Sequence, residues 1–207
     1  MKLSHISLAF LFVALSCKSQ NIQALEGPYN HNIDQPRPIY VKDLNNIRAP
    51  FIGVWQGNDG NKELTIFLYE LNDVPNGLYG SVEEQFKDGI MGYYIYKENN
   101  VEVLNTRQNL LDQNISNKQQ YGPIFGFTSD GLKMTGMGFL DYGINILQED
   151  GTQSDSKRGV SNIEIVNPLE ATFNLENQPH IMGPYNYDFS IPTSLTLTKI
   201  SDTPPPL

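Results

Sequence analysis

Short stretches of alternating apolar and polar residues, separated by turn residues, fill the chain from residue 51 to residue 200. In one of them Leu64, Ile66 and Leu68 occupy alternate positions, which places all three on the same side of an extended strand. The Asn-Asp-Gly turn signal at residues 58–60 precedes this stretch at hairpin distance. Because no helix-length segments lie between the stretches, the pattern predicts an antiparallel all-β domain and argues against a parallel α/β sheet.

We expect roughly nine to eleven short strands, linked as a meander. A core is available, since 39% of the residues are hydrophobic and the chain holds 11 Tyr and 10 Phe, which favour strands. No repeat of roughly 20 to 50 residues is visible, which argues against a propeller or solenoid. A single antiparallel meander barrel is the expected fold, and a β-sandwich is the alternative. The expected strands cover residues 51–56, 63–71, 77–86, 90–98, 101–106, 123–129, 132–140, 144–149, 160–166, 170–176 and 194–200.

The β domain is predicted to span residues 41–201. Residues 202–207 are predicted to be a disordered tail, because their three consecutive prolines cannot continue a strand ladder. The segments without strand character are residues 41–50 (a helical turn closing one end of the domain), 87–89 (a turn), 108–120 (a loop or short helix) and 150–159 (a loop).

The N-terminus resembles the signal peptide of a bacterial lipoprotein. The apolar run Ile6–Leu15 is too short to span a bilayer as an anchor. Cys17, the chain's one cysteine, stands where this run ends, and Ala14 before it resembles the lipobox pattern, although with Leu15 in the reverse of the usual order. We expect residues 1–16 to be a signal helix that is removed and Cys17 to be lipidated. The alternative is an ordinary signal peptide cleaved near an incidental cysteine.

Residues 17–40 are rich in Asn, Gln and Pro and are predicted to be the lipidated cysteine and a flexible tether. Lys18-Ser19-Gln20 lacks the Asp common in inner-membrane lipoproteins and the acidic cluster of surface-exposed ones. By that resemblance we expect the protein to lie on the periplasmic face of the outer membrane. Its N-terminal lipid would bind it to that membrane. The formal charge of −9 argues against nucleic acid as a partner, because phosphate would be repelled.

Two details of the strands are similar to the lipocalin and calycin pattern. Gly53-Val54-Trp55 is a G-x-W near the start of the first expected strand, and Lys199 shares a strand face with Leu197 in the last one. In that pattern the tryptophan packs at the closed end of a barrel beneath a cation from the last strand. The resemblance implies that Trp55 and Lys199 close this barrel, whereas a lone Trp in an ordinary β core is the alternative.

A second resemblance covers more of the chain. The order of three blocks is similar to small uncharacterised lipoproteins of the Bacteroidota, a flavobacterial-type family with a domain of unknown function. These blocks are a G-x-W strand, a D-x-x-x-G-x-Y-x-Y strand at Asp88, Gly92, Tyr94 and Tyr96, and a terminal P-T-x-x-x-L-T-K strand that starts at Pro192. This likeness implies a fold and a location and no activity.

No pattern points to catalysis, to a cofactor or to a metal. There is no H-E-x-x-H, G-x-S-x-G or phosphate-binding glycine loop, and His180 is the one histidine within the expected β domain. Glu84 is expected to face inward, where a buried carboxylate could be functional. The alternative is a solvated acid near a barrel mouth, or one paired with Lys199 or Arg107. Glu149, Asp150 and Asp155 either bind Ca²⁺ through their carboxylate oxygens or lie in a solvated hairpin loop. The group Tyr69, Tyr79, Tyr93, Tyr94 and Tyr96 forms either an aromatic wall for a ligand or ordinary cross-strand packing.

Three functions therefore remain open. The first is a lipid-anchored binding module whose barrel encloses a small apolar or amphipathic ligand, with room left by Gly80, Gly92, Gly136 and Gly138. The second is a structural or interaction protein of the envelope with a filled core. The third is an enzyme with a cluster of acids or tyrosines near His180, for which no catalytic constellation is found. The volume left inside the barrel distinguishes them.

Overall fold

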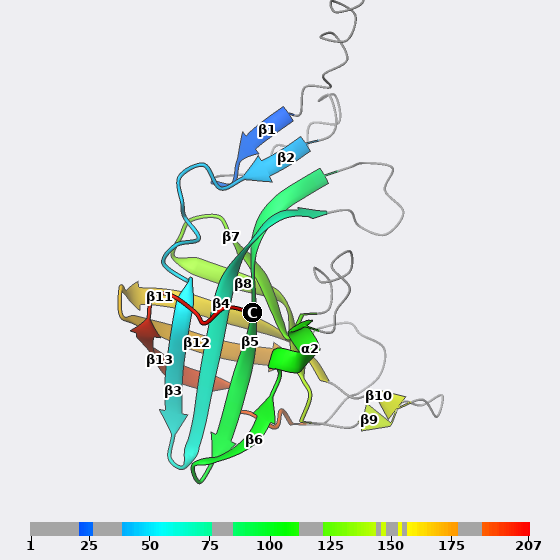
Figure 1. Ribbon diagram of the computed structural model, residues 1–207, viewed down its shortest axis with the longest axis vertical. Coiled ribbons are helices and arrows are strands. Elements are labelled where there is room, and N and C mark those ends of the chain that lie inside the picture. The colour runs from blue at the N-terminus through cyan, green and yellow to red at the C-terminus, as the bar shows by residue number, and fades with distance from the viewer. Residues whose placement is uncertain are drawn as a thin grey trace, which may run out of the picture.

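Figure 1 shows the computed structural model, which describes residues 21–26, 39–75, 85–111, 122–143, 146–147, 153–154, 157–177 and 188–207. These residues are almost entirely strand, with one short helix, α2 (Arg107–Leu111). The strands are β1 (Asn21–Ala24), β2 (Ile39–Lys42), β3 (Gly53–Asp59), β4 (Lys62–Pro75), β5 (Gln85–Glu98), β6 (Val101–Asn105), β7 (Ile124–Thr128), β8 (Lys133–Asp141), β9 (Ile146–Leu147), β10 (Gln153–Ser154), β11 (Lys157–Asn167), β12 (Glu170–Asn177) and β13 (Ser194–Ser201).

Eight strands close into an antiparallel barrel in the order β3-β4-β5-β7-β8-β11-β12-β13. Each of them pairs with the next along the chain, and β13 pairs with β3, so the ring has no open edge. The predicted all-β meander barrel is confirmed, and the sandwich alternative is wrong. Closure follows from the length of β5, whose second edge pairs in turn with β2, β7 and β6.

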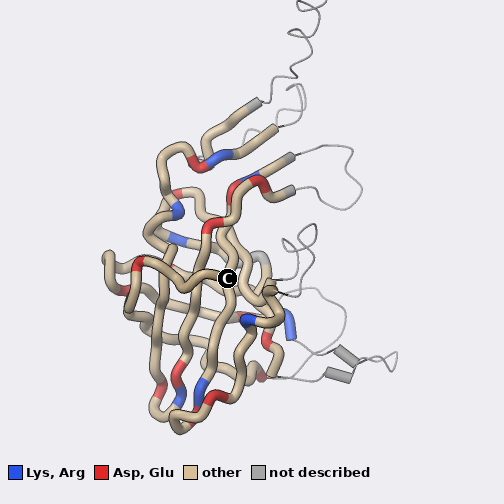
Figure 2. The backbone as a smooth tube through the Cα atoms, viewed as in Figure 1, with Lys and Arg blue, Asp and Glu red and all other residues tan. Residues whose placement is uncertain are grey.

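The interior is packed with large side chains. Every second residue of the ring strands points inward, as in β13, where Leu195 and Leu197 are buried between exposed neighbours. Phe139 lies at the centre of the aromatic packing: its ring stacks on Tyr94 at 4.9 Å and contacts Phe173 at 5.9 Å between centroids. Figure 2 shows that the middles of the strands carry few charged residues, whereas both signs occur in the hairpins at their ends.

The predicted turn at Lys87-Asp88-Gly89 is wrong. These residues lie inside β5, which continues unbroken from Gln85 to Glu98. Asp-Gly favours a turn locally, but here the Asp88 carboxylate is buried and accepts hydrogen bonds from neighbouring elements. Tertiary contacts therefore hold the segment extended.

Three predicted irregular segments also differ from the structure. β1 lies within the stretch predicted to be a tether, because Leu25 beside it packs with Ile39 and Val41 of β2. β11 begins at Lys157, inside the predicted loop at residues 150–159. The tail at residues 202–207 is also not loose, since its carbonyl groups accept hydrogen bonds from the barrel wall.

The predicted helical turn before the first barrel strand is present. Phe51 N and Ile52 N donate hydrogen bonds to the carbonyls three residues earlier, and Phe51 is fully buried in the main core. The segment therefore covers one end of the barrel, as expected. We call this the closed end, and we call the opposite end, beyond the β3–β4 hairpin, the mouth.

Candidate functional site

At the closed end the structure brings Trp55 and Lys199 together. They are register partners across β3 and β13, and Lys199 Nζ lies 5.4 Å from the centroid of the fully buried Trp55 ring. Lys199 Nζ also donates to the Pro50 carbonyl at 3.2 Å and lies 3.0 Å from a carboxylate oxygen of Asp202. The indole N–H donates to the Phe51 carbonyl at 2.8 Å. The cation thus joins the last strand, the first strand and the turn before it.

Gly53, the glycine of the G-x-W pattern, has a specific role in this joint. Its φ of +134° lies in a region that L side chains rarely adopt, and a Cβ there would overlap the carbonyl oxygen of Ser201. A glycine therefore allows β13 to approach the start of β3. Because the polar atoms named here have partners within the fold, the closed end is a structural joint.

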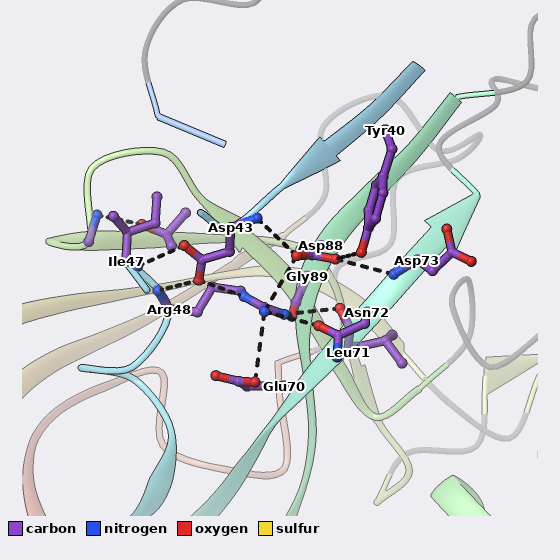
Figure 3. Close-up of polar contacts among 12 residues, drawn as sticks. Tyr40, Asp43, Ile47, Arg48, Glu70, Leu71, Asn72, Asp73, Asp88 and Gly89 are labelled. Atoms are coloured by element: carbon purple, nitrogen blue, oxygen red, sulfur yellow. Dashed lines mark hydrogen bonds and ion pairs between the residues drawn. The ribbon is translucent and has the colours of Figure 1, made fainter. Parts of the chain in front are cut away.

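A buried ionic network attaches β2 and the turn after it to the barrel (Figure 3). Arg48 is 5% exposed and reaches between Asp43 on its own turn and Asp88 on β5. Its Nε lies 2.9 Å from Asp43, and its Nη1 donates to the carbonyls of Leu71 and Gly89 at 3.2 and 3.0 Å. Its Nη2 donates to Asn72 Oδ1 at 3.0 Å. Because all of its nitrogen atoms donate hydrogen bonds, this guanidinium fixes the turn after β2, the end of β4 and the start of β5 relative to each other.

The carboxylates of this network are also fully engaged. Asp88 accepts from the Tyr40 hydroxyl at 2.5 Å and from the amides of Asp43 and Asp73 at 2.9 and 3.2 Å. Burial opposes ionisation of Asp43, but hydrogen bonds from Arg48 and two amides outweigh it and lower the pKa of Asp43. Burial and then the bond to Asp88 raise the pKa of Tyr40 to about 12. This network stabilises the fold and offers no unfilled position to a ligand.

The mouth differs, because a cavity of about 630 Å³ opens there. Four parts of the chain line it: Asp59 and Lys62 of the β3–β4 hairpin, Lys157 at the start of β11, the end of β12 from Leu175, and residues 188–194. A volume of roughly 300 to 1,000 Å³ is typical of small-molecule sites. We call this cavity the mouth pocket.

The apolar wall of the mouth pocket comes from the segment at residues 188–193. Ile191 is buried, and both Ile191 and Phe189 pack against the main core. Asp141 at the end of β8 holds this segment: its carboxylate accepts from Ser190 N at 2.6 Å and from Ser190 Oγ at 2.5 Å. Asp141 is fully buried, so these bonds are shielded from water.

Phe189 lies directly over β11. A Cβ on Gly159 would come within 2.7 Å of the Phe189 ring, so the absence of a side chain there allows the ring to rest on the strand. This contact places the ring beside Lys157, two residues earlier on the same face of β11. The pocket therefore combines apolar surface from Phe189, Ile191 and Leu175 with an amine.

Lys157 is the unusual residue of the pocket. It is 3% exposed, and its Nζ has no hydrogen-bond partner; Ser161 Oγ is the one other buried side-chain atom of this kind within the described residues. Nζ lies 4.0 Å from the centroid of the Phe189 ring. Burial lowers the pKa of Lys157, while the carboxylates of Asp188 and Asp141 act in the opposite direction. A buried ammonium with three unused donors is costly unless something binds to it.

A family model, described as a family of unknown function (DUF6705), matches residues 1–200 of the chain. The chain belongs to DUF6705. No curated protein and no solved structure matches it. The resemblance to a domain of unknown function is thus confirmed at the level of the family.

In this DUF6705 chain the four tyrosines of the group that the structure describes do not form one wall. Tyr94 and Tyr96 are buried in the barrel interior, whereas Tyr69 and Tyr93 belong to a separate cluster with Phe67. The Phe67 and Tyr93 rings stack at 4.4 Å between centroids. The other candidates of the sequence analysis lie outside the described residues: Cys17, Tyr79, Gly80, Glu84, Glu149, Asp150, Asp155 and His180.

The described residues hold no group of three or more His, Cys, Asp or Glu side chains placed to bind a metal ion. In the same residues, no helix has both the length and the apolar character needed to cross a membrane.

The sequence analysis of the DUF6705 chain missed Lys157, Phe189 and Asp141. Lys157 follows a run of polar residues typical of a loop, which hides its place on a strand. The available signal was alternation read backwards from Ile163, since Ser161, Gly159 and Lys157 continue its face. For Phe189 no local signal existed, because its position depends on Asp141, 48 residues earlier, through Ser190.

Proposed function

We propose that this protein is a membrane-anchored binding module that holds a small amphipathic ligand in the mouth pocket. The observation that carries the proposal is the combination at one end of a closed barrel of a cavity of about 630 Å³, apolar walls and a buried amine without a partner. Ligand sites in proteins combine apolar surface with a few placed polar groups. Here Leu175, Phe189, Ile191 and Pro192 supply the apolar part of a lining that is otherwise polar or charged.

The packed interior supports a ligand bound at the end of the barrel. Fully buried Trp55, Tyr94 and Phe139 occupy the space behind the pocket, so the ligand would enter from the mouth and stop above them. The rigid ring would hold the pocket in shape before the ligand arrives, which lowers the entropic cost of binding.

The anchor in this proposal is the lipid on Cys17. Support comes from the sequence, where the one thiol of the chain follows an apolar run of signal-peptide length. Several acyl chains would hold the protein durably at a membrane, because each buried CH₂ contributes about 0.8 kcal/mol. We propose the outer membrane, facing the periplasm, as its location.

Ligand binding is tested on protein purified from the cell in which it is made. Native mass spectrometry should show a copurifying small molecule, and a panel of lipids and sugars should raise the melting temperature for an amphipathic class. As a control, Phe189→Ala removes the apolar wall and should abolish the shift. A protein that carries nothing and responds to nothing in the panel would refute the binding function.

Lipidation is tested separately by metabolic labelling with an alkyne fatty acid. The unmodified chain should take up the label and fractionate with membranes, and Cys17→Ala should lose both properties. Label that persists in Cys17→Ala would show that the anchor is not at this residue.

The second candidate is an envelope interaction protein that acts through its surface. The density of aromatic side chains inside the barrel favours it, since the space around Phe139 and Phe173 is occupied. The two functions differ in their response to Phe189→Ala: loss of ligand binding supports the module, whereas crosslinking to a constant partner in intact cells, unchanged by this substitution, supports the alternative.

A further inference from the structure

The chain leaves the Lys157 amine without a partner. Two carboxylates act on it electrostatically: Asp188, with the larger effect, and Asp141, its register partner on β8. Both oxygens of Asp141 already accept hydrogen bonds, from the backbone and hydroxyl of Ser190 and from the amide of Gly143. Asp188 acts on Lys157 electrostatically but is exposed to solvent. The face of the Phe189 ring and the two carboxylates partly compensate the buried charge, but the donors of Nζ make no hydrogen bond.

The pocket around this amine limits what can approach it. Leu175, Phe189 and Ile191 provide an apolar wall, so the body of the ligand is apolar. Asp59, Glu176 and Asp188 are exposed at the rim, and together they outnumber the two lysines that line the pocket. A ligand with several negative charges would be repelled by these acids, whereas a single anionic group placed at Lys157 would gain a charge-assisted hydrogen bond in a shielded site.

We propose that the mouth pocket binds an amphipathic monocarboxylate, with its carboxylate on Lys157 Nζ and its apolar chain against Phe189 and Ile191. This inference rests on the proposed ligand-binding function and specifies the chemistry of the ligand. Lys157 anchors the head group, and Asp141 is a positioning residue that holds Ser190 and hence Phe189.

The test compares two probes of equal chain length, octanoate and 1-octanol, by isothermal titration calorimetry. The full-length chain carries Cys17→Ser, which removes the proposed lipid and leaves every described residue in place. Octanoate should bind more tightly than 1-octanol. Lys157→Met, which keeps the volume and removes the charge, should weaken octanoate by roughly 10- to 100-fold, the effect of losing a hydrogen bond to a charged group. Binding of 1-octanol should change less than about threefold.

Matched variants locate the effect. Lys133→Met removes an exposed lysine of β8 that does not line the pocket and should leave octanoate affinity within about threefold. Lys157→Arg keeps a cation and should retain more affinity than Lys157→Met. Asp141→Asn should weaken both probes together, since it loosens the apolar wall and leaves the amine in place.

The outcomes separate the two proposals. Equal affinity for octanoate and 1-octanol in the Cys17→Ser chain, or a Lys157→Met variant that binds octanoate normally, overturns the carboxylate assignment and leaves ligand binding intact. Failure of both probes to bind counts against the binding function itself. The comparison of probes on the Cys17→Ser chain needs no substitution in the pocket, so a misfolded pocket variant does not remove the test.

Discussion

Lys199 and Lys157 are both buried cations over aromatic rings, but their surroundings differ. Lys199 has a carbonyl and a carboxylate within hydrogen-bond distance, so its charge is compensated within the fold. Lys157 Nζ has neither. The same residue type therefore stabilises the closed end and, at the mouth, leaves donors available for a ligand.

The pairing of Trp55 with Lys199 predicts a measurable coupling. A double-mutant cycle with Lys199→Met and Trp55→Leu, followed by urea unfolding, should give a coupling free energy of about 0.5 to 2 kcal/mol, the range for a cation over an aromatic face. Asp202→Asn serves as a control, because the side chain of Asp202 is 87% exposed and its pair with Lys199 should contribute little. A coupling near zero would show that the two residues are neighbours without interacting.

The Tyr40–Asp88 bond predicts a pH dependence of stability. The pKa of Tyr40 is about 12 in the fold against 10.0 for an unperturbed tyrosine, so the protonated form is favoured in the folded state. That contribution is complete below pH 10 and is lost as the pH rises from 10 to 12. In Tyr40→Phe, the fall in unfolding free energy between pH 10 and pH 12 should be smaller than in the unmodified chain. Urea titrations at steps of pH measure it, and identical slopes in the two proteins would contradict the assignment.

Individual residues show where sequence reasoning succeeds and where it fails. Trp55 could be selected in advance from the G-x-W resemblance, and Lys199 from the regular alternation that places it on the face of Leu197. Asp88 and Gly89 were misread as a turn because their local preference is opposite to the conformation that the Arg48 network imposes. Lys157 follows a polar run that looks like a loop, so its place on a strand was missed. The side of the sheet that such a terminal residue faces depends on its register with the neighbouring strand, which is β8 here.

At the scale of elements, the ring strands were predictable and their boundaries less so. β4 and β13 follow clear alternation, whereas β5 is longer than predicted because one strand serves three partners along its second edge. β1 and the C-terminal tail were predicted to be irregular, yet β1 pairs with β2 and the tail lies against the barrel. Such docking is hard to predict from the sequence of the docked segment, because it depends on the residues of the surface against which the segment packs.

The C-terminal tail crosses the outer face of β4 and β5 (Figure 1). The Tyr69 hydroxyl donates to the Pro205 carbonyl at 2.7 Å, and Arg107 Nη2 donates to the Pro206 carbonyl at 3.0 Å. Prolines lack an N–H but keep a free carbonyl, so a proline-rich segment binds well to donors beside aromatic rings. Tyr69 stands next to Tyr93 at 6.2 Å between ring centroids, which provides that surface.

Docking of the tail predicts that the effect of Tyr69→Phe depends on the tail. In the full chain the substitution should reduce the unfolding free energy by about 1 kcal/mol, the value of one hydrogen bond. In a chain that ends at Asp202 the same substitution should have almost no effect, because the acceptor is gone. Urea unfolding of the four proteins gives the cycle. An equal loss in both backgrounds would mean that Tyr69 acts through the barrel wall and not through the tail.

At the scale of the whole molecule, the barrel separates two tasks. The closed end joins the first and last ring strands through Trp55 and Lys199, and the ionic network of Arg48 fixes the segment before them. The mouth lies at the opposite end of the same strands, and its residues do not join the first ring strand to the last. A change at the mouth should therefore leave the stability of the ring nearly unchanged, which makes Lys157 and Phe189 suitable positions for testing function.

Ring closure predicts that β13 is indispensable and the tail is not. A chain that ends at Thr193 loses Leu195, Leu197 and Lys199 from the interior and exposes the edges of β3 and β12. Open edges pair with other chains, so this protein should aggregate and show no cooperative urea transition. A chain that ends at Asp202 keeps β13 and should remain monodisperse and cooperative, by size-exclusion chromatography and urea unfolding. Cooperative unfolding of the shorter chain would mean that seven strands form a stable unit and that closure through β13 is not what holds the barrel together.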